Sequence, residues 1–117
     1  MRRILVTGAT SFVGISLAAK ILNSGVCVDA IVRPQTDLSK FEEFGIHPNF
    51  LVHGEDQDAD AKSLAKLIEI SKPDAVIHIA GHYVRNHQIS DIEALTQSNI
   101  VFGTQLLEAM KMVGINK

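Results

Sequence analysis

The chain has 117 residues, a hydrophobic fraction of 46% and a formal net charge of −2 at pH 7. This length and composition suit one domain with a buried core, so we treat residues 1–117 as one unit. A near-neutral charge without a Lys/Arg-rich run argues against a nucleic-acid partner. The single Cys27 excludes an internal disulfide and a zinc site built from cysteines.

From the N-terminal residues we expect neither a membrane anchor nor a signal peptide. Arg2 and Arg3 precede an apolar run, but Thr7-Gly8 interrupts it too early for a signal peptide. No apolar stretch in the chain approaches the length of a membrane-spanning helix. We therefore expect a cytoplasmic protein with no membrane partner.

Strand and helix periods alternate along the chain. Short apolar runs predict strands over Arg3 to Thr7, Val26 to Val32, Phe50 to His53 and Ala75 to Ala80. Apolar residues at helical spacing predict helices over Phe12 to Asn23, with Val13, Leu17 and Ile21 inward, and over Ala59 to Ile70, with Leu64, Leu67 and Ile68 inward. A short polar helix is expected over Asp37 to Phe44.

The last predicted helix is the longest. Its inward stripe follows three- and four-residue spacing through Ile92, Leu95, Asn99, Phe102, Leu106, Ala109 and Val113, and Gly114 is suited to end it. Alternating strands and helices, with strands apolar on both faces, favour an α/β protein with a doubly wound parallel sheet, the Rossmann fold. Right-handed crossovers then give the strand order 3-2-1-4.

The turn after the first strand is the strongest functional signal. Residues 7–14 read Thr-Gly-Ala-Thr-Ser-Phe-Val-Gly. In such a sheet this turn lies where ligands bind, and the free N–H groups of the following helix favour phosphate. Gly8 permits a sharp turn, and Gly14 lets the helix approach the sheet. A glycine pair after a strand also occurs without a ligand, but this one opens the first βαβ unit, as a dinucleotide fingerprint does.

The candidate residues for binding the pyrophosphate of a dinucleotide are Gly8, Thr10, Ser11, Phe12, Val13 and Gly14. No Gly-Lys-Ser/Thr follows, so a nucleotide-triphosphate loop is excluded. Counting nineteen residues on from Gly14 reaches Arg33, just past the second strand. Arg can pair with a 2′-phosphate, so we predict NADP in preference to NAD. Alternatively, Arg33 is solvated or stacks on the adenine. Asp29 is the other charged candidate, but we expect it to lie too deep in the strand to reach the ribose.

Three segments resemble the extended short-chain dehydrogenase/reductase family, which contains NAD(P)-dependent sugar-nucleotide epimerases, dehydratases and reductases. Residues 4–14 are similar to its T-G-x-x-G-x-x-G opening, residues 73–81 to P-D-x-V-I-H-x-A, and residues 99–109 to N-x-x-G-T-x-x-L-L-E-A with one extra residue before Gly103. Ser11 stands where the family usually has its middle Gly. Its side chain could crowd the pyrophosphate, bond a phosphate oxygen, or serve as a plain helix cap.

The resemblance implies further site residues. Glu55 and Asp56 would lie beside the adenine, although an acidic solvated loop explains them equally well. Ala80, Gly81 and His82 would line the nicotinamide-side ribose. Asn99 would help to order water and backbone near the active site, or is a locally satisfied residue without a catalytic role. His78, His82 and His87 share no helical face, so we expect no metal site.

The family's catalytic Tyr-x-x-x-Lys is missing. The only tyrosine is Tyr83, and His87 stands four residues later. We therefore expect an N-terminal portion, truncated before the fifth strand, that binds a dinucleotide but holds no catalytic residue. The full-length protein would act on a nucleotide sugar, and the last helix would form a homo-oligomer. The alternatives are a non-catalytic NADP-sensing module that acts through a protein partner, and a structural α/β domain that binds no dinucleotide.

Overall fold

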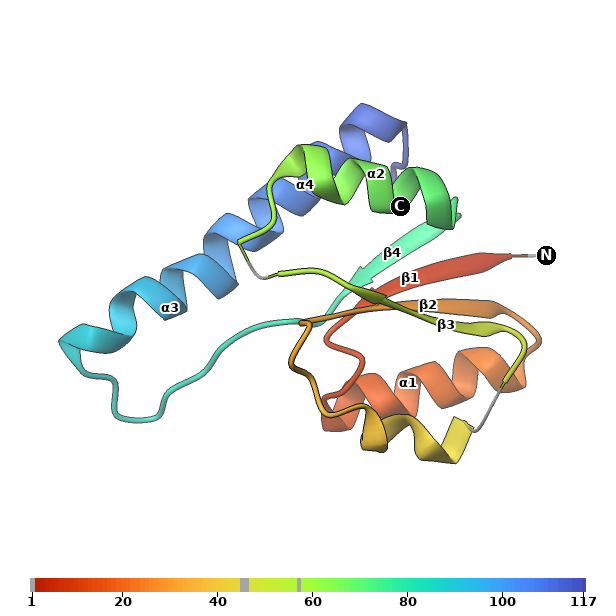
Figure 1. The fold of residues 1–117 in the computed structure, drawn as a ribbon, viewed down its shortest axis with the longest axis horizontal. Helices are drawn as coiled ribbons and strands as arrows, with labels where there is room; N and C mark the ends of the chain where they lie inside the picture. The colour runs from red at the N-terminus through yellow and green to blue at the C-terminus, as the bar shows by residue number, and fades with distance from the viewer. Residues whose placement is uncertain (1, 45–46, 57) are drawn as a thin grey trace.

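A parallel four-stranded sheet is the centre of the fold (Figure 1). The computed structural model describes residues 2–44, 47–56 and 58–117. In chain order, the elements on the N-terminal side are β1 (Arg3–Thr7), α1 (Phe12–Asn23), β2 (Cys27–Val32), the 3₁₀ helix η1 (Leu38–Phe44) and β3 (Phe50–Gly54). They are followed by α2 (Ala61–Ser71), β4 (Ala75–His78), the 3₁₀ turn η2 (Ile89–Asp91), α3 (Ile92–Thr96), the π-helical η3 (Gln97–Val101) and α4 (Phe102–Val113).

The strand order is β3-β2-β1-β4, and every neighbouring pair is parallel. Leu5 in the middle of β1 lies opposite Asp29 of β2 and Val76 of β4. Helices α2 and α4 cover one face of the sheet, and α1 with η1 covers the other (Figure 1). The predicted doubly wound Rossmann sheet and its order 3-2-1-4 are therefore confirmed.

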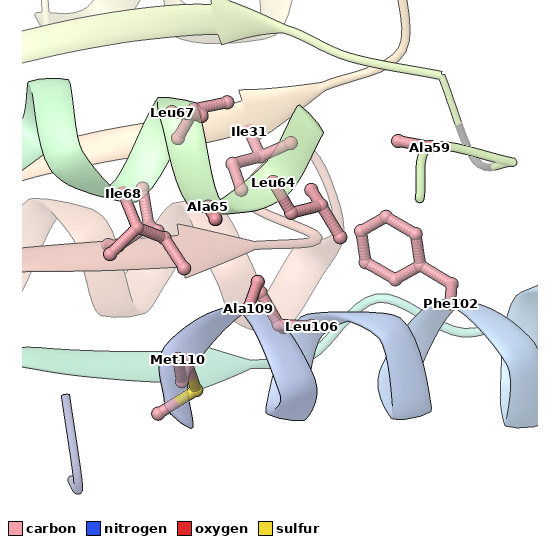
Figure 2. Close-up of a cluster of buried hydrophobic side chains, with 11 residues drawn as sticks. Ile31, Ala59, Leu64, Ala65, Leu67, Ile68, Phe102, Leu106, Ala109 and Met110 are labelled. Carbon is pink, nitrogen blue, oxygen red and sulfur yellow. The ribbon is translucent and has the colours of Figure 1, made fainter. Parts of the chain in front are cut away.

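The core between the sheet and the α2–α4 layer is built mainly from aliphatic side chains, together with Phe102 and Met110 (Figure 2). Leu64, Leu67 and Ile68 of α2 are buried, as predicted, against Leu5 of β1 and Leu106 of α4. Each fully buried side chain of this size contributes about 1.5–3 kcal/mol relative to exposure. Helix α2 begins at Ala61 rather than Ala59, because Asp60 caps it by accepting a hydrogen bond from the Ser63 N–H at 2.9 Å.

On the other face, α1 buries a different set of residues from the one predicted. Gly14, Ala18 and Leu22 face the sheet, whereas Val13 is 61% exposed and Leu17 and Ile21 are half-buried. The predicted inward stripe was therefore wrong by one residue. Gly14 and Ala18 are small, and their size lets the helix axis approach the strands closely.

Three aromatic rings hold η1 against the edge of the sheet. Phe41 lies 5.9 Å from Phe44 and 5.0 Å from Phe50, measured between ring centroids, and Phe44 lies 5.1 Å from Phe50. Such offset and edge-to-face pairs add to the burial of the rings. The short helix expected over Asp37 to Phe44 thus forms as a 3₁₀ helix that starts at Leu38.

The last helical segment is continuous but not regular. Phe102, Leu106 and Ala109 of α4 are buried as predicted, whereas Ile92 at the start of α3 is 52% exposed. Helix α3 extends beyond the sheet (Figure 1), so the N-terminal part of the predicted stripe has no core to face. Among the described residues, no helix has the length and apolarity to cross a membrane.

Candidate functional site

A cleft of about 700 Å³ opens at the carboxyl ends of β1, β2 and β4. Here the chain leaves β1 toward one face of the sheet and leaves β4 toward the other. Ligands bind at such switch points in open parallel sheets. Nine residues predicted for the site line this cleft: Gly8, Thr10, Ser11, Val13, Arg33, Glu55, Ala80, Gly81 and His82. Residues far apart in sequence are thus brought to one site by the carboxyl ends of the four strands.

The turn after β1 is packed tightly against two other segments. Gly8 has a φ of +73°, and a Cβ there would lie 2.6 Å from the backbone nitrogen of Ala80. A Cβ on Gly14 would lie 2.2 Å from the carbonyl oxygen of Gly8. Both positions therefore require glycine, which holds the first turn of α1 close to the exit of β4.

Ser11 acts as the N-cap of α1. Its Oγ accepts a hydrogen bond from the Gly14 N–H at 3.0 Å, and its hydroxyl donates to the carbonyl oxygen of Gly8 at 2.8 Å. Of the three expectations for this residue, the helix cap is the one that forms. Because N–H groups in a first helical turn have no intrahelical acceptor, those of Phe12 and Val13 remain available, and none of the described residues accepts from them.

Four predicted site residues do not line the cleft themselves. The side chain of Phe12 is 90% exposed, Asp56 is exposed, and Gly14 is buried beneath the turn. Asn99 contacts the site through the backbone: its Oδ1 accepts from the His82 N–H, and its Nδ2 donates to the His82 carbonyl, both at 2.8 Å. Asn99 thus fixes the segment that follows β4.

Sequence reasoning missed several lining residues, namely Thr7, Gln35, Thr36, Asp37, Lys40, Ser98 and Phe102. Thr7 lies in the fingerprint turn, so its position was available as a signal. The segment 33–40 is polar and has no periodicity, and its place beside the cleft follows only from the turn after β2. Hydrogen bonds from the Ser39 side chain and backbone lower the pKa of the Asp37 carboxyl, which therefore stays ionised beside the cationic Arg33 and Lys40.

Asp29 lies deep in β2, as expected, and does not reach the cleft. Its side chain is fully buried and pairs with Arg3 at 2.7 Å and with His53 at 2.8 Å. These contacts join β1, β2 and β3 across the face of the sheet. Within the described ranges, no three His, Cys, Asp or Glu side chains are grouped so that they could share a metal ion.

The fold and the cleft define an α/β domain of the Rossmann type. The model of the NAD dependent epimerase/dehydratase family matches residues 4–117, and the chain belongs to that family. The chain is 31% identical over 110 residues to a CDP-abequose synthase of Salmonella muenchen and 29% identical over 116 residues to a dTDP-glucose 4,6-dehydratase of Neisseria meningitidis serogroup B. These matches cover 93% and 95% of the chain, but only 33% and 32% of those proteins. The chain thus spans about a third of the length of these relatives.

Solved structures show the same architecture. The enzyme WbmH of Bordetella bronchiseptica, in complex with NAD⁺, matches with a TM-score of 0.78 at 27% identity, over 98% of this chain and 36% of WbmH. A UDP-glucose-4-epimerase of Stenotrophomonas maltophila, with bound NAD and formylated UDP-arabinopyranose, matches with a TM-score of 0.85 at 24% identity, over 99% and 35% of the two chains. The latter likeness supports the fold alone.

Proposed function

We propose that this chain binds a nicotinamide adenine dinucleotide with its pyrophosphate at the start of α1. The observation that carries the proposal is the pair of available N–H groups on Phe12 and Val13, beside a cleft of about 700 Å³. Two N–H donors and the positive end of a helix dipole suit a diphosphate. The glycines at positions 8 and 14 allow the backbone to form this turn without side chains in its way.

The two halves of the dinucleotide would lie on either side of this turn. Arg33 and Glu55, which follow β2 and β3, would border the adenosine half. Ala80, Gly81 and His82, which follow β4, would border the nicotinamide half, where small residues leave room for the ribose. When bound, the nicotinamide ring would supply hydride transfer, and the residues of this chain would bind and orient it.

The amide resonances of the α1 turn test this proposal. On titration with NAD, the backbone N–H signals of Phe12 and Val13 should shift downfield, as expected for donors to phosphate oxygens. The amides of Gly25 and Gly114, which lie outside the cleft lining, serve as the control. Shifts absent at positions 12 and 13, or equal at all four positions, would contradict the proposal.

We also propose that NADP binds more tightly than NAD. Arg33 and Lys40 both line the cleft beyond β2, and a planar guanidinium pairs well with a 2′-phosphate. The structures of WbmH and of the epimerase described above hold NAD, so the preference rests on these two residues alone. Calorimetry should show tighter binding of NADP, and Arg33→Ala should weaken NADP by about tenfold while changing NAD little. Equal affinities in the unsubstituted chain would refute the preference.

For a longer protein that contains this chain, we propose a nucleotide-sugar epimerase, dehydratase or reductase. The names of the relatives above support this class. Tyr83 is the only tyrosine of the chain and has no lysine four residues later, so we expect the 117 residues by themselves to bind without turnover. A catalytic Tyr-x-x-x-Lys encoded downstream would support the enzyme, and its absence would favour a sensing module.

We propose further that the last helical segment pairs with a second copy of the chain. Ile92, Ile100, Leu107 and Met112 of this segment are each more than half exposed, and exposed apolar faces of this kind mark interaction sites. Light scattering at increasing concentration should show a dimer, and Leu107→Glu should shift it to the monomer. A monomer at all concentrations would contradict this proposal.

A further inference from the structure

The hydroxyl of Thr7 joins β1 to the segment that leaves β4. Its Oγ lies 2.6 Å from Nδ1 of His78, the last residue of β4. It also accepts hydrogen bonds from the N–H groups of Ile79 and Ala80, both at 3.2 Å. The side chain of Thr7 is almost fully buried, so water cannot replace a missing partner. Thr7 Oγ thus makes three contacts, with His78, Ile79 and Ala80, in a place that water does not reach.

The arrangement assigns a protonation state to His78. A hydroxyl has one proton to donate and two lone pairs with which to accept. The backbone N–H groups of Ile79 and Ala80 can only donate, and the Ile79 N–H is shared between Thr7 Oγ and the Thr7 carbonyl oxygen, both at 3.2 Å. Among the described residues, Nδ1 of His78 is the acceptor within reach of the hydroxyl proton. The Thr7 proton must then be donated to Nδ1 of His78, and this requires an imidazole that is neutral, with its proton on Nε2.

A protonated His78 would disrupt this arrangement. With a proton on Nδ1, the ring would become a third donor toward Thr7, and the buried hydroxyl proton would lose its acceptor. Leaving a buried polar group without a partner costs more than a typical hydrogen bond contributes. The uptake of one proton at His78 thus disrupts this contact, and Thr7, the residues after β4 or the exposed His78 ring itself must move.

The surroundings of the ring favour the neutral form. The ring lies 5.8 Å from that of Phe102, centroid to centroid, and its Nε2 lies 3.4 Å from where a Cβ on Gly103 would stand. His78 as a whole residue is exposed, but the atoms around its ring shield it partly from water, and this desolvation lowers the pKa of the His78 imidazole below its ordinary value of 6.5. From β1, Thr7 faces the ring, and from α4, Phe102 and Gly103 do. None of these is charged, and no ion pair to the ring exists in the described part of the chain.

The same atoms form the wall of the cleft. Thr7, Ile79 and Ala80 all line it, and the backbone of Ala80 is in close contact with the turn at Gly8. We propose that His78 is a positioning residue that holds this wall through Thr7 only while it is neutral, so that proton uptake at His78 weakens dinucleotide binding. This inference rests on the proposed function and adds a pH response to it.

The direction of the response follows from the lowered pKa. Above about pH 6.5 the ring is neutral and the wall is intact, so affinity should be independent of pH. As the pH falls below that value, the free chain takes up a proton that the complex must release, and affinity should decrease. The loss of one hydrogen bond corresponds to about a fivefold decrease in affinity once the His78 ring is protonated.

Calorimetry on the full chain tests the inference. NAD is the probe because it lacks the 2′-phosphate monoester, which itself titrates near pH 6. His78→Asn should restore binding and remove the pH dependence, since the asparagine carbonyl oxygen can accept from Thr7 at the position of Nδ1. His78→Gln places its amide near Nε2 instead, and should bind about fivefold more weakly at every pH. His87→Asn, in the exposed loop after β4, should keep the dependence of the unsubstituted chain.

Two outcomes would overturn the inference. One is equal NAD affinity in the unsubstituted chain at about pH 8 and at an acidic pH where the ring resonances show His78 protonated, and the other is a pH dependence that His78→Asn leaves unchanged. The ¹⁵N resonances of the His78 ring give a reading that needs no ligand. They should show an unprotonated Nδ1 and a protonated Nε2 at about pH 7.5, and the reverse would also overturn it. If NAD does not bind at any pH, the proposed function fails, while the ring resonances still decide whether His78 donates to Thr7 or accepts from it.

Discussion

Replacing Gly14 with alanine tests how closely α1 must approach the turn before it. The new Cβ would lie 2.2 Å from the Gly8 carbonyl oxygen and 2.7 Å from the Cα of Ala9, whereas ordinary contacts begin at 3.4 Å. Both atoms belong to the backbone, so no side-chain rotation can relieve the overlap. The start of α1 must move by roughly 1 Å.

We expect this displacement to cost about 2 kcal/mol of unfolding free energy, in the range of other overpacked sites. With a urea m-value of about 2 kcal/mol per molar for a small domain, the unfolding midpoint should fall by about 1 M. NAD should bind at least tenfold more weakly, because the N–H groups of Phe12 and Val13 move with the helix.

Urea unfolding followed by circular dichroism, together with calorimetry, measures both effects. Gly54→Ala is the matched control, since a Cβ there meets nothing within 4 Å. This control should stay within about 0.5 kcal/mol of the unsubstituted chain. If Gly14→Ala unfolds at the same midpoint as Gly54→Ala, the tight contact inferred between α1 and the turn is wrong.

Three further predictions concern named side chains. Asp29→Ala should lower the unfolding free energy by about 3 kcal/mol, because Arg3 and His53 lose the buried carboxylate they share; a change below about 1 kcal/mol in urea unfolding would contradict this. Ser11→Ala should cost about 1 kcal/mol through the lost cap, and Ser11→Gly only a few tenths in the same assay. Hydrogen bonds from Ser63 lower the pKa of the Asp60 carboxyl below its ordinary value of 3.8, so its stabilising effect is complete above that pH and is lost as the pH falls further. Asp60→Asn should therefore flatten the acid side of a plot of unfolding midpoint against pH, and an unchanged slope would count against the cap.

The sheet could be predicted from sequence because each strand is a short apolar run bounded by glycine, proline or polar residues. The inward face of α1 could not be predicted from hydrophobic periodicity. Hydrophobicity ranks Val13, Leu17 and Ile21 above Gly14 and Ala18, but the helix turns its small residues inward because Gly14 must contact the Gly8 carbonyl. That contact joins two parts of one turn, so it produces no helical periodicity in the sequence from which the inward face could be predicted.

The irregular end of the chain gives a similar lesson. The motif around Asn99 holds one residue more than the family pattern before Gly103, and η3 forms there as a turn of π-helix. A π turn bonds residue i to i+5 and so takes up one extra residue. It lets Asn99 reach the His82 backbone while Phe102 still enters the core. The sequence shows the surplus residue, but not where the helix absorbs it.

The contact of Phe41 and Phe44 of η1 with Phe50 of β3 separates two tasks along the stretch from Arg33 to Phe44. Phe41, with only 6% of its surface exposed, anchors the stretch together with Phe44 and Phe50, while Arg33 and Lys40 stand in solvent at the border of the cleft. Exchanging the latter pair alters the charge offered to a ligand and leaves the anchor intact. The cofactor preference proposed above is therefore open to redesign, and to evolutionary drift, at little risk to folding.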